Sequence, residues 1–264
     1  MDFDSNTKIV VNTQIKPNKP ILVVGLPGIG SVGKLVAEHL KNEFGGKKFA
    51  TVYSSHFPHR VIMLKNGNVR LVNNRFYIIK NSNKGESDIV VLTGDDQAVT
   101  TEGQYDVNMK IVKFFKEELK GRFIYTIGGY SSSEVVQGVP RVFGNVTSKK
   151  VIEEFKGTDV IFGKTKGMIW GSAGLIIAFA KMNNIDGICL MGETAFADLD
   201  AAAAKSVLLT VSKKLGLQIN TKNFDIIIEK TAKALKTFEQ QLSIGTQPTG
   251  SEYQKSDQSP TYIR

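Results

Sequence analysis

The chain has 264 residues, of which 41% are hydrophobic, and carries a formal net charge of +9. This length and hydrophobic content suffice for one large globular domain. No apolar run approaches the about 20 residues that a membrane-spanning helix needs, and the polar first residues lack the hydrophobic stretch that directs export. The single cysteine, Cys189, lies in an apolar segment and has no partner for a disulfide, so we expect a cytoplasmic protein without a membrane partner.

The positive charge raises the question of nucleic-acid binding, because clustered basic residues gain free energy by releasing counterions from phosphates. Lysines instead occur in small separate groups, and no basic stripe is interleaved with aromatic residues. We therefore expect no nucleic-acid partner, and interpret the charge as a solvated basic surface or a weak attraction to an acidic partner.

In chain order, the first half of the sequence predicts short strands interrupted by two helices. Residues 20–25 form a compact apolar run that ends at a glycine, and residues 32–44 then show apolar side chains at helical spacing. Asn66-Gly67 is typical of a β-hairpin turn, because both residues tolerate a positive φ. The expected elements are strands at residues 8–14, 20–25, 49–53, 61–64, 69–71, 75–79, 88–92 and 122–127, the last ended by Gly128-Gly129, and helices at residues 32–44 and 105–119.

The second half continues this alternation and ends in a polar segment. From Ser243 onward too few apolar groups remain to offset the entropy of ordering the chain. We therefore expect one α/β domain over residues 1–242 and a flexible, disordered C-terminal tail over residues 243–264. The expected elements are strands near Val142 and at residues 160–162 and 187–191, and helices at residues 149–155, 171–182, 198–215 and 224–242.

Short apolar strands that alternate with helices predict a definite fold class. Each connecting helix must bury its apolar stripe against the sheet, so both faces of the sheet become covered. We expect an α/β fold with a mixed, mainly parallel sheet flanked by helices. The hairpin meander inserted over residues 61–79 is the expected source of the antiparallel pairs.

A glycine-rich turn between the apolar run 20–25 and the next helix matches two nucleotide-binding motifs. Gly28, Gly30 and Gly33 fit the dinucleotide fingerprint, in which glycines let the backbone approach a pyrophosphate at a helix N-terminus. That fingerprint also requires an acidic residue about 20 positions later to bind the ribose. The strand expected at residues 49–53 has no acid at its end, so we expect no bound NAD or FAD.

The same turn matches the start of a P-loop, whose lysine binds phosphates and whose final Ser or Thr binds magnesium. The final position here is Leu35, which cannot ligate magnesium and whose helical spacing places it on the core face. We therefore expect no cofactor, and interpret the glycines as allowing close packing of helix on strand. A candidate anion site at the helix N-terminus remains open; its residues are Gly25, Gly28, Gly30, Gly33 and Lys34.

Acidic residues at strand ends are the alternative candidates for chemistry. Asp95 and Asp96 follow the strand expected at residues 88–92, and Glu193 follows the strand expected at 187–191. Ligands of α/β proteins collect at the carboxyl ends of such strands. The two aspartates would serve equally well as acids that stabilise the start of the next helix.

Histidine and serine motifs in the sequence are incomplete. His56 and His59 are separated by Pro58, and no cysteine or nearby acid completes a zinc site. Ser172 follows Gly171 directly, whereas a nucleophile elbow has one residue between its first glycine and the serine. We expect no metal site and no catalytic residue.

Four segments together resemble the proteasome assembly chaperone 2 family, archaeal type; they are residues 21–33, 94–97, 125–130 and 190–194. The resemblance covers about residues 21–242. It implies a phosphorylase/hydrolase-like fold without an established catalytic site, a homo-oligomer, and the α subunits of the proteasome core particle as partners. Some members carry an ATP-grasp label, but no residue set in this chain supports ligation.

The resemblance also implies a role for the C-terminal tail, which in such chaperones docks between α subunits through a hydrophobic residue, a penultimate tyrosine and a free last residue. This chain ends in Tyr262, Ile263 and Arg264, so the tyrosine lies one position early and the match is partial. We expect a non-catalytic chaperone-like protein that binds α subunits, with tail docking as an open second contact. The alternative is a small-molecule or nucleotide-binding enzyme that uses the helix end at residues 28–34.

Overall fold

The computed structural model describes residues 6–81, 86–132, 136, 138–164, 167–195 and 198–244, with the backbone alone for residues 234–244. The strands are β1 (Thr7–Val11), β2 (Ile21–Gly25), β3 (Lys47–Ser54), β4 (Val61–Met63), β5 (Val69–Leu71), β6 (Asn74–Ile79), β7 (Ile89–Gly94), β8 (Phe123–Ser131), β9 (Val142–Val146), β10 (Val160–Phe162) and β11 (Asp186–Thr194). The helices are α1 (Val32–Glu43), α2 (Thr101–Glu117), α3 (Lys149–Glu154), α4 (Ser172–Met182), α5 (Ala201–Leu215) and α6 (Lys222–Ile244), with a short 3₁₀ helix, η1 (Ile29–Ser31).

A nine-stranded sheet forms the centre of the fold, in the order β1-β3-β6-β7-β2-β8-β11-β9-β10. Strands β7, β2, β8 and β11 run parallel to one another. An antiparallel ladder of β1, β3 and β6 extends the sheet on one side, and β9 pairs antiparallel with β11 on the other. The predicted mixed sheet flanked by helices is confirmed, with parallel pairing at its centre.

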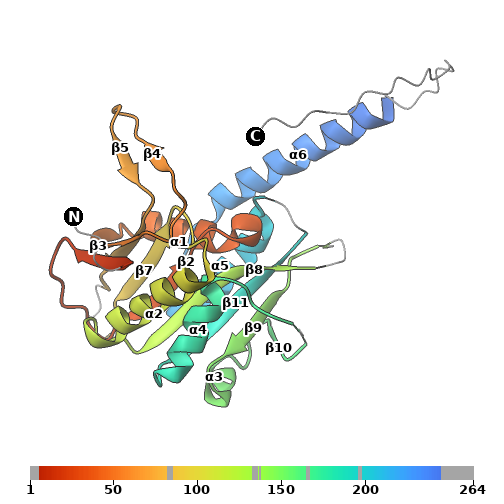
Figure 1. Ribbon diagram of the computed structural model, residues 1–264. Coiled ribbons are helices and arrows are strands. Elements are labelled where there is room, and N and C mark those ends of the chain that lie inside the picture. Colours follow the sequence, from red (N-terminus) through yellow and green to blue (C-terminus); the bar gives the residue numbers. More distant parts are fainter. Residues whose placement is uncertain are drawn as a thin grey trace.

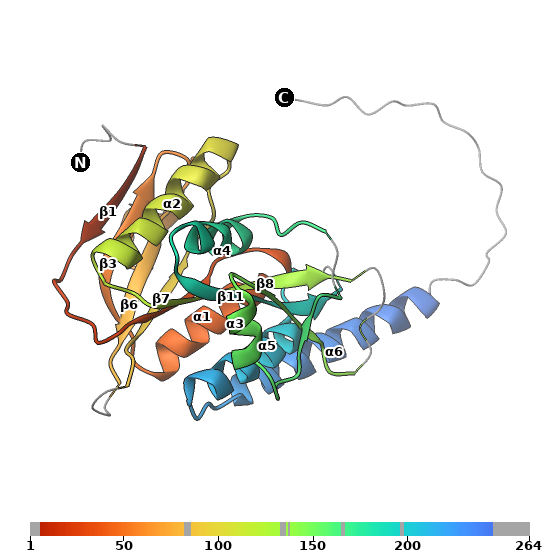
Figure 2. The same cartoon turned by 90° about the horizontal axis from the view of Figure 1, so that it is seen from below.

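Helices cover both faces of the sheet (Figure 2). Helices α2 and α4 pack on one face, where the apolar core includes Leu22, Val24 and Ile111. Helices α1, α3 and α5 and the start of α6 pack on the other face, around Val23, Val36 and other buried side chains. Every residue of β2 and β7 is buried, as expected for central strands with cover on both sides. Each fully buried Leu, Ile or Val side chain contributes about 1.5–3 kcal/mol to folding.

Side-chain caps set two helix starts that differ from the predicted ones. Helix α2 begins at Thr101 rather than at Tyr105, because the Thr100 hydroxyl accepts a 3.0 Å hydrogen bond from the Gly103 amide. Helix α5 begins after Asp200, whose carboxylate accepts a 2.8 Å bond from the Ala203 amide. Each cap satisfies an amide that has no partner within its helix.

Strand β8 does not stop at Gly128-Gly129 as predicted, but continues to Ser131 beside β11. The sequence predicts that the two glycines end the strand, whereas in the structure Gly129 lets another segment of the chain come close to the strand. A Cβ on Gly129 would lie 2.4 Å from the carbonyl oxygen of Ile29 in the loop after β2. The glycine therefore makes room for that loop on the face of a continuing strand.

The hairpin predicted around Asn66-Gly67 forms, but outside the main sheet. Strands β4 and β5 pair only with each other, as a separate two-stranded sheet that projects from the body (Figure 1). Strand β6 already pairs with β3 on one side and β7 on the other, which leaves no free edge for the hairpin. The predicted meander over residues 61–79 therefore makes the sheet mixed only through its last strand, β6, which pairs antiparallel with β3 and β7. The other antiparallel pairs come from β1 and β9.

Helix α6 packs its first turns on the body through Phe224, Ile227 and Ile228 and then extends away from it (Figure 1). It runs to Ile244, two residues past the predicted end of the helix. The remainder of the predicted tail, residues 245–264, lies outside the described residues. No described helix combines the length and the apolar character needed to cross a membrane.

Candidate functional site

The glycine turn joins β2 to α1 through η1, and two of its glycines are required by packing. A Cβ on Gly25 would lie 2.0 Å from the Gly33 carbonyl oxygen and 2.6 Å from the Ala37 Cβ. A Cβ on Gly33 would lie 2.4 Å from the Ile127 carbonyl oxygen of β8. Backbone atoms cannot retreat from such contacts, so Gly25 and Gly33 let α1 lie directly against β2 and β8.

The start of α5 closes over the same turn. The Asp200 amide donates a 2.8 Å hydrogen bond to the Gly30 carbonyl oxygen, and the Ser31 hydroxyl donates one of 3.1 Å to the Asp198 carbonyl oxygen. Gly30 has a φ of 60°, the left-handed region that favours glycine. The turn is thus held by hydrogen bonds to the segment that leads into α5.

The residues after Gly33 differ in their surroundings. Leu35 packs against the core that α1 shares with α5, as its spacing predicts. Lys34 is partly exposed and makes no hydrogen bond or ion pair with the described residues. The candidate anion site therefore has a lysine nearby, but no magnesium-binding hydroxyl at the position that a P-loop uses.

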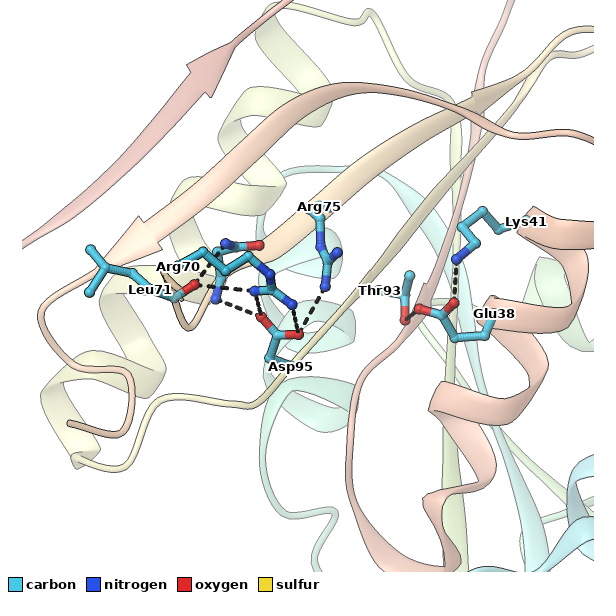
Figure 3. A network of polar contacts seen from close by, with 8 residues as sticks. Glu38, Lys41, Arg70, Leu71, Arg75, Thr93 and Asp95 are labelled. Atoms are coloured by element: carbon cyan, nitrogen blue, oxygen red, sulfur yellow. Dashed lines mark hydrogen bonds and ion pairs between the residues drawn. The ribbon is translucent and has the colours of Figure 1, made fainter. Parts of the chain in front are cut away.

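Asp95 lies at the end of β7 and is surrounded by donors (Figure 3). Arg70 of β5 binds both of its carboxylate oxygens, and the Arg75 Nη2 lies 2.9 Å from its Oδ1. The Asn73 amide donates a further bond of 3.0 Å to Oδ2. Burial raises the pKa of Asp95, but the hydrogen bonds from Arg70 and Asn73 and the charge of Arg75 outweigh it and hold the pKa below its usual value. The carboxylate therefore fastens the hairpin to the sheet.

The other two candidate acids also have partners. Asp96 pairs with Arg60 and accepts a 2.9 Å bond from the Gln97 amide. Glu193 is almost fully buried at the end of β11 and receives two bonds from the Arg141 guanidinium, of which the Nε bond is 2.8 Å. These bonds lower the pKa of Glu193 against the opposing effect of burial. Both carboxylates are therefore occupied by partners within the chain.

The predicted acids do not converge on one site. Strands β7 and β11 are separated by β2 and β8, and neighbouring strands lie about 4.8 Å apart, so Asp95 and Glu193 are roughly 14 Å apart across the sheet. That separation is too large for a carboxylate pair acting on one bond, which needs at most about 9.5 Å.

The described histidines and the cysteine lie in surroundings typical of structural residues. The His56 Nδ1 lies 2.9 Å from the Thr100 hydroxyl, and His39 pairs with Glu43 at 2.7 Å. Among the described residues no group of three or more His, Cys, Asp or Glu side chains is placed to hold a metal ion. Burial raises the pKa of the Cys189 thiol to about 11, so this cysteine lacks the thiolate that a nucleophile or metal ligand needs.

A cavity of about 390 Å³ opens at the carboxyl ends of β2 and β8, beside the first turn of α4. Its floor is apolar and includes Val24, Leu26 and Ile127. Gln97 bridges its walls: the side-chain Nε2 donates a 2.6 Å bond to the Pro27 carbonyl oxygen, and Oε1 accepts a 2.8 Å bond from the Ser172 amide. The cavity thus lies between the glycine turn and the start of α4.

The sequence picks out several residues of this cavity separately, but it does not predict that they line one site. Gly28 was attributed to a nucleotide motif, Gly128 to a strand end, and Ser172 to an incomplete nucleophile elbow. Gln97 belongs to one of the segments that carry the family resemblance, residues 94–97, and no role follows for it from the sequence. Their convergence follows from the order of β7, β2 and β8 in the sheet, which no local pattern encodes. The wall contains no histidine among its described residues, so Ser172 has no neighbouring base there.

Comparison with known proteins gives a consistent set of relatives. A family model described as the PAC2 family matches residues 22–239. An uncharacterized protein of Methanocaldococcus jannaschii is 36% identical over 233 residues, which are 87% of this chain and 86% of that protein. The crystal structure of Pyrococcus furiosus PbaB, described as an archaeal proteasome activator, matches at 40% identity with a TM-score of 0.84, over 89% of this chain and 99% of that chain. P. furiosus PbaA, described as an archaeal homolog of proteasome-assembly chaperone, is 21% identical with a TM-score of 0.74 over 91% and 94% of the two chains, and bears on the fold alone.

Proposed function

Because the chain belongs to the PAC2 family, we propose that it acts on the proteasome by protein contact, as an assembly chaperone or activator. The observation that carries this proposal is the 40% identity to PbaB over almost the whole of that chain. The proposed partners are the α subunits of the core particle, and the proposed location is the cytoplasm. The proposed mechanism is templating, in which bound surfaces orient subunits without covalent chemistry.

The geometry of the candidate acids supports a non-catalytic role. Asp95 and Glu193 are held in ion pairs with arginines on well-separated strands. A general base must lie within hydrogen-bond reach of the proton that it removes and have a pKa close to the working pH, whereas the pKa values of Asp95 and Glu193 are both lowered. These carboxylates are therefore better suited to holding the body rigid than to transferring protons.

For the tail we propose docking between α subunits through Tyr262, Ile263 and Arg264. These residues lie outside the described part of the chain, so the support comes from what precedes them. Helix α6 points away from the body, and the 20 residues after Ile244 reach up to roughly 65 Å when extended. The tethered end would search a neighbouring surface at a raised effective concentration.

A pull-down of purified core particle tests both contacts. We expect the intact chain to bind, truncation after Ile244 to weaken binding, and Tyr262→Ala with Ile263→Ala to weaken it to a similar extent. Tyr253→Ala is the matched control, because it removes a tyrosine from the same polar segment and should leave binding unchanged. Absence of binding by the intact chain would overturn the chaperone proposal; full binding by the truncated chain would overturn tail docking alone.

We also propose that the chain forms a homo-oligomer through the β4–β5 hairpin. Five of its apolar side chains are exposed: Val61, Met63, Leu64, Val69 and Leu71. An isolated two-stranded sheet is marginally stable in water, and contiguous exposed apolar surface usually marks a protein contact. The Arg70–Asp95 ion pair holds the hairpin in place before any partner arrives, which lowers the entropic cost of association.

Light scattering tests this second contact. Met63 is 85% exposed near the hairpin tip, so Met63→Asp should leave folding intact while placing a charge in the interface. We expect the variant to sediment and scatter as a smaller species than the parent chain. The control is Met182→Asp, at a similarly exposed methionine at the far end of α4, which should leave the assembly unchanged. An intact chain that is monomeric, or a Met63→Asp assembly of full size, would contradict the proposal.

A further inference from the structure

The cavity beside α4 is kept open by two glycines that nothing in the surrounding structure requires. A Cβ on Gly28 would lie 3.7 Å from the nearest atom, the Gln97 Nε2, and one on Gly128 would lie 3.6 Å from the Ala173 Cβ. Both distances are ordinary contacts, and neither glycine has a positive φ. Gly25, Gly33 and Gly129 differ, since a Cβ on any of them would meet backbone within 2.4 Å. Side chains at positions 28 and 128 would instead project into the cavity, so their absence preserves its volume.

One wall of the cavity presents hydrogen-bond donors without partners. Ser172 is only 2% exposed, and its hydroxyl makes no hydrogen bond to any described residue. The neighbouring Ala173 amide lies in the first turn of α4, where amides have no acceptor within the helix. The N-cap residue Gly171 supplies no side-chain cap, and of the donors in this turn Gln97 binds only the Ser172 amide. The Ser172 hydroxyl and the Ala173 amide belong to residues that line the cavity. A hydroxyl without a protein partner on a cavity wall is available to a ligand or a water molecule.

The rest of the wall is apolar and has an aromatic rim. The floor is formed by the buried side chains of Val24, Leu26 and Ile127, and Trp170 stands at the mouth with 79% of its surface exposed. Small-molecule sites commonly combine a mostly apolar lining with a few convergent polar groups. A volume of about 390 Å³ accommodates a fragment-sized organic molecule.

The charge of the wall narrows the class of ligand. None of the described residues that line the cavity is charged. A phosphate dianion would lack the arginine or lysine that usually balances it, whereas a singly charged carboxylate matches the partial positive charge of a helix N-terminus. We propose that this cavity binds a small carboxylic acid, with its apolar body over the floor and its carboxylate accepting hydrogen bonds from the Ser172 hydroxyl and the Ala173 amide. The proposal is independent of the proteasome role.

The single tryptophan of the chain makes the binding directly measurable. Trp170 is the only tryptophan and lies at the cavity mouth, so its fluorescence reports on occupancy. Full-length protein would be titrated with 4-phenylbutyrate, with 4-phenylbutyramide as its uncharged counterpart. We expect the tryptophan fluorescence to change saturably with the acid, with half-saturation on the order of a millimolar, because the ligand is fragment-sized. The amide should bind at least about tenfold more weakly.

Two glycine variants and one serine variant locate the site. Gly128→Val and Gly28→Leu add side chains at two different positions of the cavity lining and should each weaken binding by about tenfold or more. Ser172→Ala leaves the volume open and should weaken binding by about tenfold through the lost charge-assisted hydrogen bond. Ser212→Ala is the matched control, because Ser212 is equally buried on a helix with an unpartnered hydroxyl but does not line the cavity.

Circular dichroism and thermal melts establish whether each variant folds. If a glycine variant does not fold, Ser172→Ala still tests the site, because it removes only a hydroxyl. Loss of binding in Ser172→Ala and in a folded glycine variant, with Ser212→Ala unchanged, supports the proposal. No saturable signal with the acid, equal binding of acid and amide, or undiminished binding by Ser172→Ala would overturn it.

Discussion

Replacing Asp95 with asparagine is the most informative single perturbation of this fold, because one carboxylate joins three elements. Asp95 follows β7, and its partners Arg70 and Arg75 lie in β5 and β6 (Figure 3). Asparagine keeps the size of the side chain but removes the charge. The two guanidinium groups then remain close to each other without the anion that balances them.

The burial of the three side chains sets the size of the effect. The Asp95 side chain is 12% exposed, and those of its arginine partners are 26% and 24% exposed. Breaking a fully buried pair costs about 3–5 kcal/mol, and an exposed pair contributes about 0–1 kcal/mol. Because the guanidinium groups retain access to water, we expect Asp95→Asn to lower the free energy of unfolding by about 2 kcal/mol. For a chain of this size that lowers Tm by about 4–8 °C.

The assay is thermal and urea unfolding at fixed protein concentration, with Asp96→Asn as the neighbouring control. The Arg60 partner of Asp96 is 59% exposed, so the control should cost less than about 1 kcal/mol. Because the folded pKa of Asp95 lies below its unfolded value, its contribution is complete above about pH 4 and is lost as the pH falls through the folded pKa. Equal losses in the two variants at neutral pH, or a difference between Asp95→Asn and the parent that does not shrink as the pH falls below about 4, would refute the reasoning.

Three further outcomes are expected. Gly25→Ala should give insoluble protein or lower the free energy of unfolding by more than about 2 kcal/mol, because the new Cβ would lie 2.0 Å from a carbonyl oxygen. Gly28→Ala is the control and should fold normally. Urea unfolding compares the two variants, and equal stabilities would contradict the prediction. Thr100→Ala should cost about 1 kcal/mol by removing the cap of α2, with the exposed neighbour Thr101→Ala as the control. Cys189 should resist a thiol reagent at pH 8 until denaturant is added, because burial raises its pKa to about 11, and rapid labelling of the native protein would contradict its burial.

The candidate site was predictable in its parts and not in its assembly. That the glycine turn lacks the chemistry of a P-loop stays a prediction; Leu35, at the position where magnesium needs a hydroxyl, packs against the core. At Gly25 and Gly33 the helix lies close against the strands, and the contacts involve Ala37 and Ile127, which lie on neighbouring elements. Asp95 was considered a helix-start acid or a catalytic group, yet it binds Arg70, whose place beside it depends on how the hairpin leaves the sheet.

The sequence by itself determined the order of strands and helices, the mixed sheet with covered faces, and membership of the PAC2 family. These follow from local periodicity and from motifs that act over a few residues. Only the tertiary structure decided that the hairpin stands apart from the sheet, that β8 runs through its two glycines, and that Gln97, Gly128 and Ser172 meet around one cavity. Each of these depends on which strands become neighbours, and that choice is made by long-range packing rather than by any short stretch of chain.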